Sequence, residues 1–320
     1  MIRLPKKVLY VVLSLISAIV LILILILALK FFDKDPAPIE TIDDDTISFD
    51  SKEYVLNRNV ETFLLIGIDD FAKDIKYDSY INTYQSDFLL LLVIDSTKEE
   101  VSAIQINRDA ITDVTVLGMQ GQRVGKEPMQ IALAHTYGTG ETDSALNTVK
   151  AVEDLFNISV DHYARITMDA IPVLNDAIGG VTLTPKVSIP DSQIEEGTKL
   201  TLNGNQALAY TRARMDVADG TNLSRMDRQH QYMTAFVEKA KKTEDINFSR
   251  VLTDINKYTV SDCSIERLQS IYNQIKGCND LGISTLKGEA TVGDEGYVEF
   301  NLDKTALQET IVSTFYKEKG

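Results

Sequence analysis

The stretches ETFLLIGID (61–69) and FLLLLVID (88–95) are nearly continuous apolar runs, each of a length suited to one strand. Continuous apolar runs are typical of strands that are covered on both faces, because a strand with one wet face alternates apolar and polar residues. The next stretch, VSAIQIN (101–107), alternates more, and a charged turn at 98–100 precedes it. These three stretches predict neighbouring strands of a sheet that is buried between two layers.

Helical and strand patterns alternate along the rest of the chain. Apolar residues recur at helical spacing in 143–157, 168–180 and 222–242, and NGNQALAYTRAR (203–214) runs from a turn into a helix. Short strand patterns occupy 163–166 and 181–185. The alternation favours the α/β class, as a layered α-β-α sandwich with a mixed central sheet.

An uncharged segment, 8–29, precedes these elements. It is mostly Leu, Ile and Val, and as a helix it would be about 33 Å long, enough for the ~30 Å hydrocarbon core of a bilayer. The residues after it, Lys30, Phe31 and Phe32, do not form a signal-peptide cleavage site. Basic residues precede the segment and acidic residues follow it, so we predict a single-pass signal anchor with 1–7 in the cytoplasm and the rest outside the cell membrane.

The charge of the outer part limits its partners. The chain carries −15 overall, and its first thirty residues hold four basic and no acidic side chains, so the remaining 28 basic and 47 acidic residues leave −19. Such a domain is not a general binder of nucleic acid, which needs a basic face. Residues 30–58 are polar and acidic and predict an extended linker, and 59–320 are long enough for one large domain.

The two cysteines, Cys263 and Cys278, flank SIERLQSIYNQIKG (264–277), whose apolar residues recur at helical spacing. A helix there would separate their Cα atoms by about 20 Å, whereas a disulfide needs ~7 Å or less. We therefore predict two buried free thiols. No zinc site is predicted, because none of the three histidines has a cysteine or histidine at metal-ligand spacing.

Four of the arginines fall within TRARMDVADGTNLSRMDRQHQ (211–231), at Arg212, Arg214, Arg225 and Arg228. On the helix predicted over 222–242, Arg225, Arg228 and Gln229 share one face. The pattern leaves two interpretations open. One is a solvated helix face paired with nearby aspartates. The other is an anion site, because several converging guanidinium groups suit a pyrophosphate.

Acidic residues stand at the ends of the predicted strands. Asp69 ends the first strand, Asp87 begins the second, and Arg108 and Asp109 follow the third. Ligand sites in layered α/β folds collect at strand ends. Mg²⁺ binds carboxylate and phosphate oxygens, so these acids facing the arginines suggest a site for Mg²⁺ and phosphate. Ordinary strand-end aspartates are the alternative.

Several of these motifs, taken in order, resemble the LytR-CpsA-Psr family of the Gram-positive cell envelope. The matching stretches lie within 61–242 and are FLLIGIDD, SDFLLLLVIDSTKEEVSAIQINRDA, NISVDHYARITMDAIPVLNDAIGGVTL, LNGNQALAYTRAR and SRMDRQHQ. The resemblance implies a membrane-anchored phosphotransferase that uses Mg²⁺. It would move a glycopolymer of the teichoic acid or capsule type from a polyprenyl pyrophosphate carrier onto peptidoglycan. The lipid tail would occupy an apolar tunnel between the sheet and the helices.

The resemblance also implies roles for individual residues. Asp69 and Asp87 would hold Mg²⁺. Asp87, Arg108 and Asp109 would be catalytic, with Asp87 or Asp109 as the base. The pyrophosphate would be bound by a set of polar and basic side chains: Arg108, Arg212, Arg214, Arg225, Arg228 and Gln229.

Three positions depart from the family pattern, which has cations where this chain has Phe71, Gln85 and Gln130. Lost cations would weaken pyrophosphate binding or catalysis. The alternative is therefore a divergent, non-catalytic member that binds lipid-linked polymer as a scaffold or regulator. The family's older description as a transcriptional attenuator fits an acidic, outward-facing domain poorly.

Overall fold

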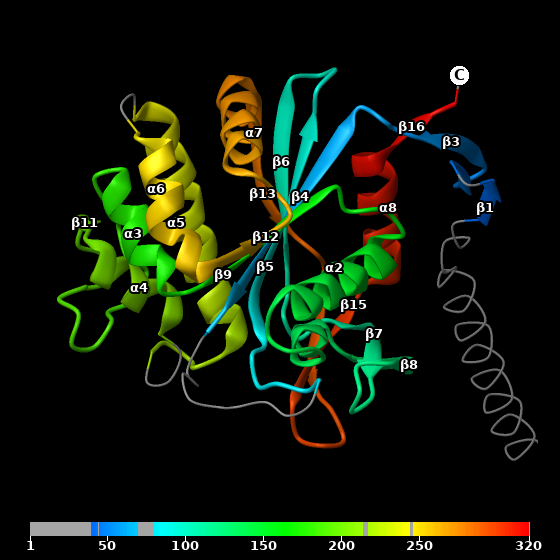
Figure 1. The fold of residues 1–320 in the computed structure, drawn as a ribbon, viewed down its shortest axis with the longest axis horizontal. Helices are drawn as coiled ribbons and strands as arrows, with labels where there is room; N and C mark the ends of the chain where they lie inside the picture. The colour runs from blue at the N-terminus through cyan, green and yellow to red at the C-terminus, as the bar shows by residue number, and fades with distance from the viewer. Residues whose placement is uncertain (1–39, 44, 70–79, 214–216, 244–245, 320) are drawn as a thin grey trace, which may run out of the picture. The chain divides into compact units, whose positions relative to one another are not determined.

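The computed structural model describes residues 40–43, 45–69, 80–213, 217–243 and 246–319 (Figure 1). The chain divides into a larger unit, Asn57–Phe315, and a smaller unit whose described part comprises 40–43, 45–56 and 316–319. Among the helices that the structure describes, none combines the length and apolar composition that crossing a bilayer requires. The predicted cytoplasmic tail (1–7) and anchor (8–29) lie outside the described residues.

The smaller unit is an antiparallel sheet in the order β1-β2-β3-β16. Its strands are β1 (Glu40–Asp43), β2 (Thr46–Phe49), β3 (Lys52–Leu56) and β16 (Tyr316–Glu318). The prediction of an extended linker over 30–58 is wrong for these strands. β1, β2 and β3 pair with one another in sequence order, and the C-terminal strand β16 adds to β3, a contact between distant parts of the chain that local sequence does not indicate.

The larger unit is built on a six-stranded mixed sheet in the order β12-β9-β4-β5-β6-β13. β4 is antiparallel to β5 and parallel to β9. Both predicted apolar runs are central strands, as expected for residues covered on both faces. The strands are β4 (Val60–Ile68), β5 (Ser86–Asp95), β6 (Glu100–Ile106), β9 (His162–Thr167), β12 (Thr259–Ser261) and β13 (Asn279–Thr285).

Helices cover both faces of this sheet, which confirms the layered α/β prediction (Figure 1). One layer holds α3 (Ala170–Ala177), α4 (Gly204–Arg212), α5 (Asn222–Lys242), α6 (Phe248–Ile255) and α7 (Ile265–Gly277). The other layer holds α2 (Thr142–Phe156) and α8 (Lys304–Phe315), and the rings of Phe156 and Phe315 meet edge to face between them. α5 matches its predicted range residue for residue, and Thr221 fixes its start by accepting a hydrogen bond from the Ser224 N–H.

The remaining elements are hairpins and short helical turns. β10 (Val181–Leu183) pairs with β11 (Leu200–Leu202), and 3₁₀ turns occur at Ile131–Thr136 and Asn256–Tyr258. The hairpins β7 (Ile111–Leu117) with β8 (Arg123–Gln130) and β14 (Gly288–Val292) with β15 (Val298–Leu302) fall where the sequence predicted no element.

Helix α7 separates the two cysteines as predicted, and both Cys263 and Cys278 are free thiols. The prediction that they are buried is wrong, because each is half-buried. Both residues lie just outside the ends of the helix, so the apolar face of α7 does not cover them completely.

The two faces of the central strands are packed differently. On β4, Leu64 and Ile66 point into the closed core and are 0% exposed. Phe63, Leu65 and Gly67 point toward α3, α5 and α6, where they border an apolar cavity of about 570 Å³. One face of β4 therefore packs into a closed core, and its other face lines the apolar cavity.

This difference predicts unequal effects of the same truncation on neighbouring residues. Leu64→Ala should lower the free energy of unfolding by about 2–5 kcal/mol, because it opens a new cavity in a closed core. Leu65→Ala, the matched control, should cost clearly less, because Leu65 already borders an open cavity. Chemical denaturation of both variants measures this, and equal losses would contradict the description of the two faces.

Candidate functional site

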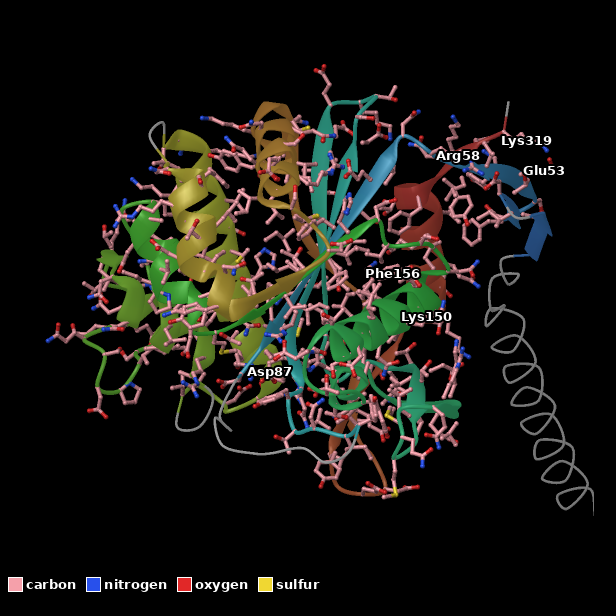
Figure 2. All side chains as sticks on the ribbon, viewed as in Figure 1. Glu53, Arg58, Asp87, Lys150, Phe156 and Lys319 are labelled. Carbon is pink, nitrogen blue, oxygen red and sulfur yellow. The ribbon has the colours of Figure 1, made fainter. Side chains whose placement is uncertain are left out.

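Charged side chains from five elements meet at one end of the central sheet. Asp69 directly follows β4, and Asp87 is the second residue of β5. Arg108 and Asp109 follow β6. Two arginines come from the helical layer, Arg212 at the end of α4 and Arg225 in the first turn of α5. Figure 2 labels Asp87 at this end of the sheet.

Asp87 joins the sheet to the helical layer. Its Oδ1 accepts hydrogen bonds from Arg108 of the sheet and, at 3.3 Å, from Nη2 of Arg225 on α5. Arg108 also approaches the other carboxylate, with its Nε 3.4 Å from Oδ1 of Asp109. The side chains of Asp87, Arg108 and Asp109 are each about one tenth exposed, so these pairs are largely shielded from water.

Asp69 is the second carboxylate of the strand ends and pairs with Arg212, whose Nε lies 3.0 Å from Oδ2. Burial raises the pKa of Asp69 above its ordinary 3.8. The charge of Arg212 opposes this rise, and the charge of Asp87 adds to it. Asp69 and Asp87 are thus close enough to repel each other, and a divalent cation between them would relieve that repulsion. Their oxygen donors fit Mg²⁺, which usually takes one or two protein carboxylates.

Arg228 and Gln229 share the predicted helix face, but the structure gives them different surroundings. All three nitrogens of the Arg228 guanidinium donate to backbone carbonyls, those of Tyr210, Ala213 and Ser224, and the residue is 2% exposed. Arg228 therefore holds the end of α4 against α5 and does not face the carboxylates as a free ligand. This corrects its predicted placement among the pyrophosphate ligands.

Gln229 faces the cavity. Its Nε2 donates to the Thr211 carbonyl at 3.3 Å, and its buried Oε1 has no hydrogen-bond partner among the described residues. Of the other predicted positions, Arg214 and Phe71 lie outside the residues that the structure describes.

The two described departures from the family pattern are part of the hydrogen-bond network. Gln85 accepts a hydrogen bond from Arg108 through Oε1. Nε2 of Gln130 donates to Oδ1 of Asp109 at 3.2 Å and also to the Val298 carbonyl. Both glutamines therefore orient charged groups of the site.

Asn222 is a site residue that the sequence analysis missed. Its Oδ1 accepts from Nη2 of Arg225 at 2.9 Å, and its Nδ2 donates to Oδ1 of Asn107 at 2.9 Å. It is 5% exposed and so fixes the guanidinium of Arg225 relative to the end of β6. The position of an asparagine just after the helix cap was the only sequence signal for it.

The apolar cavity borders this charged cluster. Gly67, Phe88, Thr211 and Gln229 line it, and Phe88 and Thr211 are the immediate neighbours of Asp87 and Arg212 in the chain. A Cβ atom on Gly67 would lie 2.9 Å from the Phe88 Cβ, so glycine is needed where the strands pass. A second apolar cavity of about 690 Å³ shares Phe63, Leu65, Leu174, Met233, Phe236 and Leu252 with the first.

Comparison with known proteins places these features in a family. A model of the LytR_cpsA_psr family matches residues 33–314. Two relatives are named polyisoprenyl-teichoic acid–peptidoglycan teichoic acid transferase TagU. The one from Enterococcus faecalis is 25% identical over 71% of this chain and 70% of its own length, and the one from Bacillus subtilis is 24% identical over 81% and 78%. Biofilm regulatory protein A of Streptococcus mutans is 24% identical over 80% of this chain and 64% of its own.

Solved structures show the same fold. A structure described as TagT bound to LI-WTA has a TM-score of 0.61 at 22% identity, covering 80% of this chain and 90% of that chain. Protein gbs0355 from Streptococcus agalactiae has a TM-score of 0.64 at 22% identity, covering 80% and 88%. At this identity the likeness concerns the arrangement of the mixed sheet and its helices.

Two arginines of the same motif should differ in their effect on stability. Arg228→Ala should lower the free energy of unfolding by about 3 kcal/mol or more, because it leaves three buried or half-buried carbonyls without their charged donor. Arg212→Ala should change it by less than about 1 kcal/mol, because that side chain is about one third exposed. Chemical denaturation checks this, and a stable Arg228→Ala protein would refute the positioning role.

The raised pKa of Asp69 predicts a pH-dependent stability. The folded state binds its proton more tightly than the unfolded state does, so this group's contribution to stability falls as pH rises from about 3.8 through the raised folded pKa. Asp69→Asn removes that contribution. In chelator-treated buffer, the stability of the variant relative to the wild type should rise over this pH range. The prediction is contradicted if the difference in unfolding free energy between variant and wild type stays constant with pH, or changes in favour of the wild type as pH rises.

Proposed function

Because the chain belongs to the LytR-CpsA-Psr family, whose model matches 33–314, we propose that it transfers a polyprenyl-pyrophosphate-linked glycopolymer to peptidoglycan. The observation that carries this proposal is the cluster of arginines and aspartates at the border of an apolar cavity. The ligand that matches both parts has a charged phosphate head and a long hydrocarbon tail. The teichoic acid transferases among the relatives support a polymer of that type.

The charges of the described cluster favour the participation of a divalent cation in transfer. Arg108, Arg212 and Arg225 are balanced by the three carboxylates of Asp69, Asp87 and Asp109. The described cluster is thus neutral, whereas a pyrophosphate diester carries two negative charges. Mg²⁺ held by Asp69 and Asp87 would supply the missing two positive charges and neutralise the phosphate oxygens.

Binding of the head group would involve an exchange of partners. The arginines that now pair with Asp69 and Asp87 would turn their donors to the phosphate oxygens as the carboxylates turn to the cation. Asn222 and Gln85 would keep Arg225 and Arg108 in place during the exchange. Arg214 is proposed as a further phosphate ligand from its place in the family motif.

The two neighbouring cavities, which share lining residues, would hold the lipid tail. Their linings are formed by apolar residues of β4 and β5 on one side and of α3, α5 and α6 on the other. Burial of each methylene group of the tail contributes about 0.8 kcal/mol, so a polyprenyl chain supplies much of the binding energy. The predicted anchor, 8–29, would keep the domain at the membrane where such a substrate resides.

The transfer step breaks the bond between the polymer's phosphorus and the oxygen that joins it to the lipid phosphate. A hydroxyl group of peptidoglycan attacks that phosphorus, and Asp87 or Asp109 accepts its proton. Lipid phosphate leaves with the bonding electron pair, and negative charge grows on it in the transition state. Arg108 and Arg225, held in partly buried positions, would stabilise that charge.

A second function is favoured by the two glutamines that replace family cations. With Gln85 and Gln130 at the site, the chain could bind lipid-linked polymer and not transfer it, as a scaffold or regulator. The two functions differ in turnover and in their need for Mg²⁺.

Transfer can be tested with the purified full-length chain, lipid-pyrophosphate polymer, peptidoglycan fragments and Mg²⁺. Release of polyprenyl phosphate and labelling of peptidoglycan should both occur, and chelation should stop them. Arg225→Ala should lower the rate by about 10²–10³-fold. Arg250→Ala on α6, a 79% exposed arginine, is the matched control and should leave the rate unchanged.

The same assay separates the alternatives. Tight binding of the lipid-linked polymer without turnover, unaffected by chelation, would support the scaffold function. If the chain shows neither binding nor transfer, both functions are refuted.

A further inference from the structure

A second group of metal-ligand side chains lies at the other end of the strands. His162 begins β9, and Asp262 and Cys263 directly follow β12, the strand that pairs with β9. Because the two strands are antiparallel, the chain leaving β12 passes the start of β9. Residues a hundred positions apart are thereby brought together, and one ligand atom from each lies within 4.8 Å of the others.

We propose that His162, Asp262 and Cys263 form a binding site for Zn²⁺. An imidazole nitrogen, a carboxylate oxygen and a thiolate are the three donor types that zinc takes in proteins. Tetrahedral zinc with ordinary bond lengths holds such atoms about 3.5 Å apart. Nδ1 of His162 and Oδ2 of Asp262 are already 3.4 Å apart. Asp262 is exposed, which leaves the fourth position open to water.

The groups around the three ligands hold them in position. The backbone N–H of Tyr163 donates to Oδ1 of Asp262 at 3.0 Å, which turns the other carboxylate oxygen toward His162. The Cys263 N–H donates to the Ser261 hydroxyl at 3.1 Å. These bonds fix the turn after β12 before any metal binds.

Glu61 completes an arrangement that is usual around zinc-bound histidine. Its Oε1 lies 3.4 Å from Nε2 of His162, on the side of the ring away from Asp262. A carboxylate that accepts the second ring N–H orients a histidine whose first nitrogen binds a metal. Without a metal, Nε2 accepts a hydrogen bond from Nε of Arg267. A metal on Nδ1 would move the ring proton to Nε2, and Arg267 would turn away as that proton is donated to Glu61.

The surrounding charges allow a divalent cation. Arg267 donates hydrogen bonds to Glu61 and, through Nε at 3.3 Å, to Nε2 of His162, so it lies on the side of the ring away from Asp262. Glu61 and Arg267 balance each other. Zn²⁺ is then balanced by the carboxylate of Asp262 and the thiolate of Cys263, and the proton of the thiol is released to water as the metal binds.

This site is separate from the carboxylate cluster of the proposed transferase. Glu61 and Asp69 lie at opposite ends of β4, and eight residues of strand span about 26 Å. Cys263 also borders the apolar cavity, together with Ser261 and Ile265. Zinc would therefore tie the β12–α7 wall of that cavity to β9, whether or not the chain transfers polymer.

The two cysteines provide a matched experiment on the full-length, metal-free chain in detergent. Titration with Co²⁺ should produce the thiolate-to-cobalt absorption band with one metal per chain, and Zn²⁺ should displace the cobalt. Cys263→Ser should lose the band and bind Zn²⁺ at least about tenfold more weakly, whereas Cys278→Ser should match the wild type. Glu61→Gln should weaken binding by about 10–100-fold.

A measurement on the wild-type chain guards against a variant that fails to fold. Zn²⁺ should slow alkylation of Cys263 and leave Cys278 unaffected, with the two sites separated by peptide mass spectrometry. Equal protection of both thiols, no zinc binding by the wild type, or unchanged binding by Cys263→Ser would each overturn the proposal. None of these readouts depends on transferase activity.

Discussion

The antiparallel pairing of β4 and β5 is the constraint on which the rest of the larger unit depends. The two strands are apolar on both faces, so each face must be covered by a separate layer. One face closes the core around Leu64 and Leu91, but on the other face apolar cavities lie between the strands and helices α3, α5 and α6. Charged residues of these two strands lie where the apolar runs end. Asp69 and Asp87 are therefore neighbours at the border of the apolar cavity.

The sequence predicts where strands and helices lie better than it predicts which elements pair or pack together. The strands at 61–69 and 88–95 and the helix at 222–242 are found where local patterns place them, because burial and capping are short-range properties. The strands at 40–56 were missed because their polar, acidic composition does not indicate strands, and their sheet is completed by β16 from the other end of the described chain. Arg228 was misplaced for a related reason. Helical spacing says that Arg225 and Arg228 are neighbours, but only the packing of α4 on α5 turns Arg228 toward backbone carbonyls.

The carboxylate cluster brings charged groups into positions where their burial is unfavourable. Burial beside Asp87 raises the pKa of Asp69, so the charged form needed for a cation is disfavoured in the empty site. Arg212 and Arg225 reduce this cost by pairing with the carboxylates, and Gln85, Gln130 and Asn222 fix the remaining donors. The replacement of cations by glutamines keeps the described cluster neutral. That neutrality is the reason why the proposed transfer of an anionic substrate includes a divalent cation.

The two ends of β4 also differ in the kind of metal that they could select. Asp69 and Asp87 offer oxygen atoms only, which favour a hard cation that keeps its water and phosphate ligands. His162 and Cys263 offer nitrogen and sulfur, which favour Zn²⁺ over Mg²⁺ through ligand softness. Two cations in the same solution would thus be sorted by donor type across about 20 Å of one strand, from Phe63, which pairs with His162, to Asp69. Such sorting requires the pairing of β9 with β12, because neither His162 nor Cys263 has a metal-ligand partner at suitable spacing in the sequence.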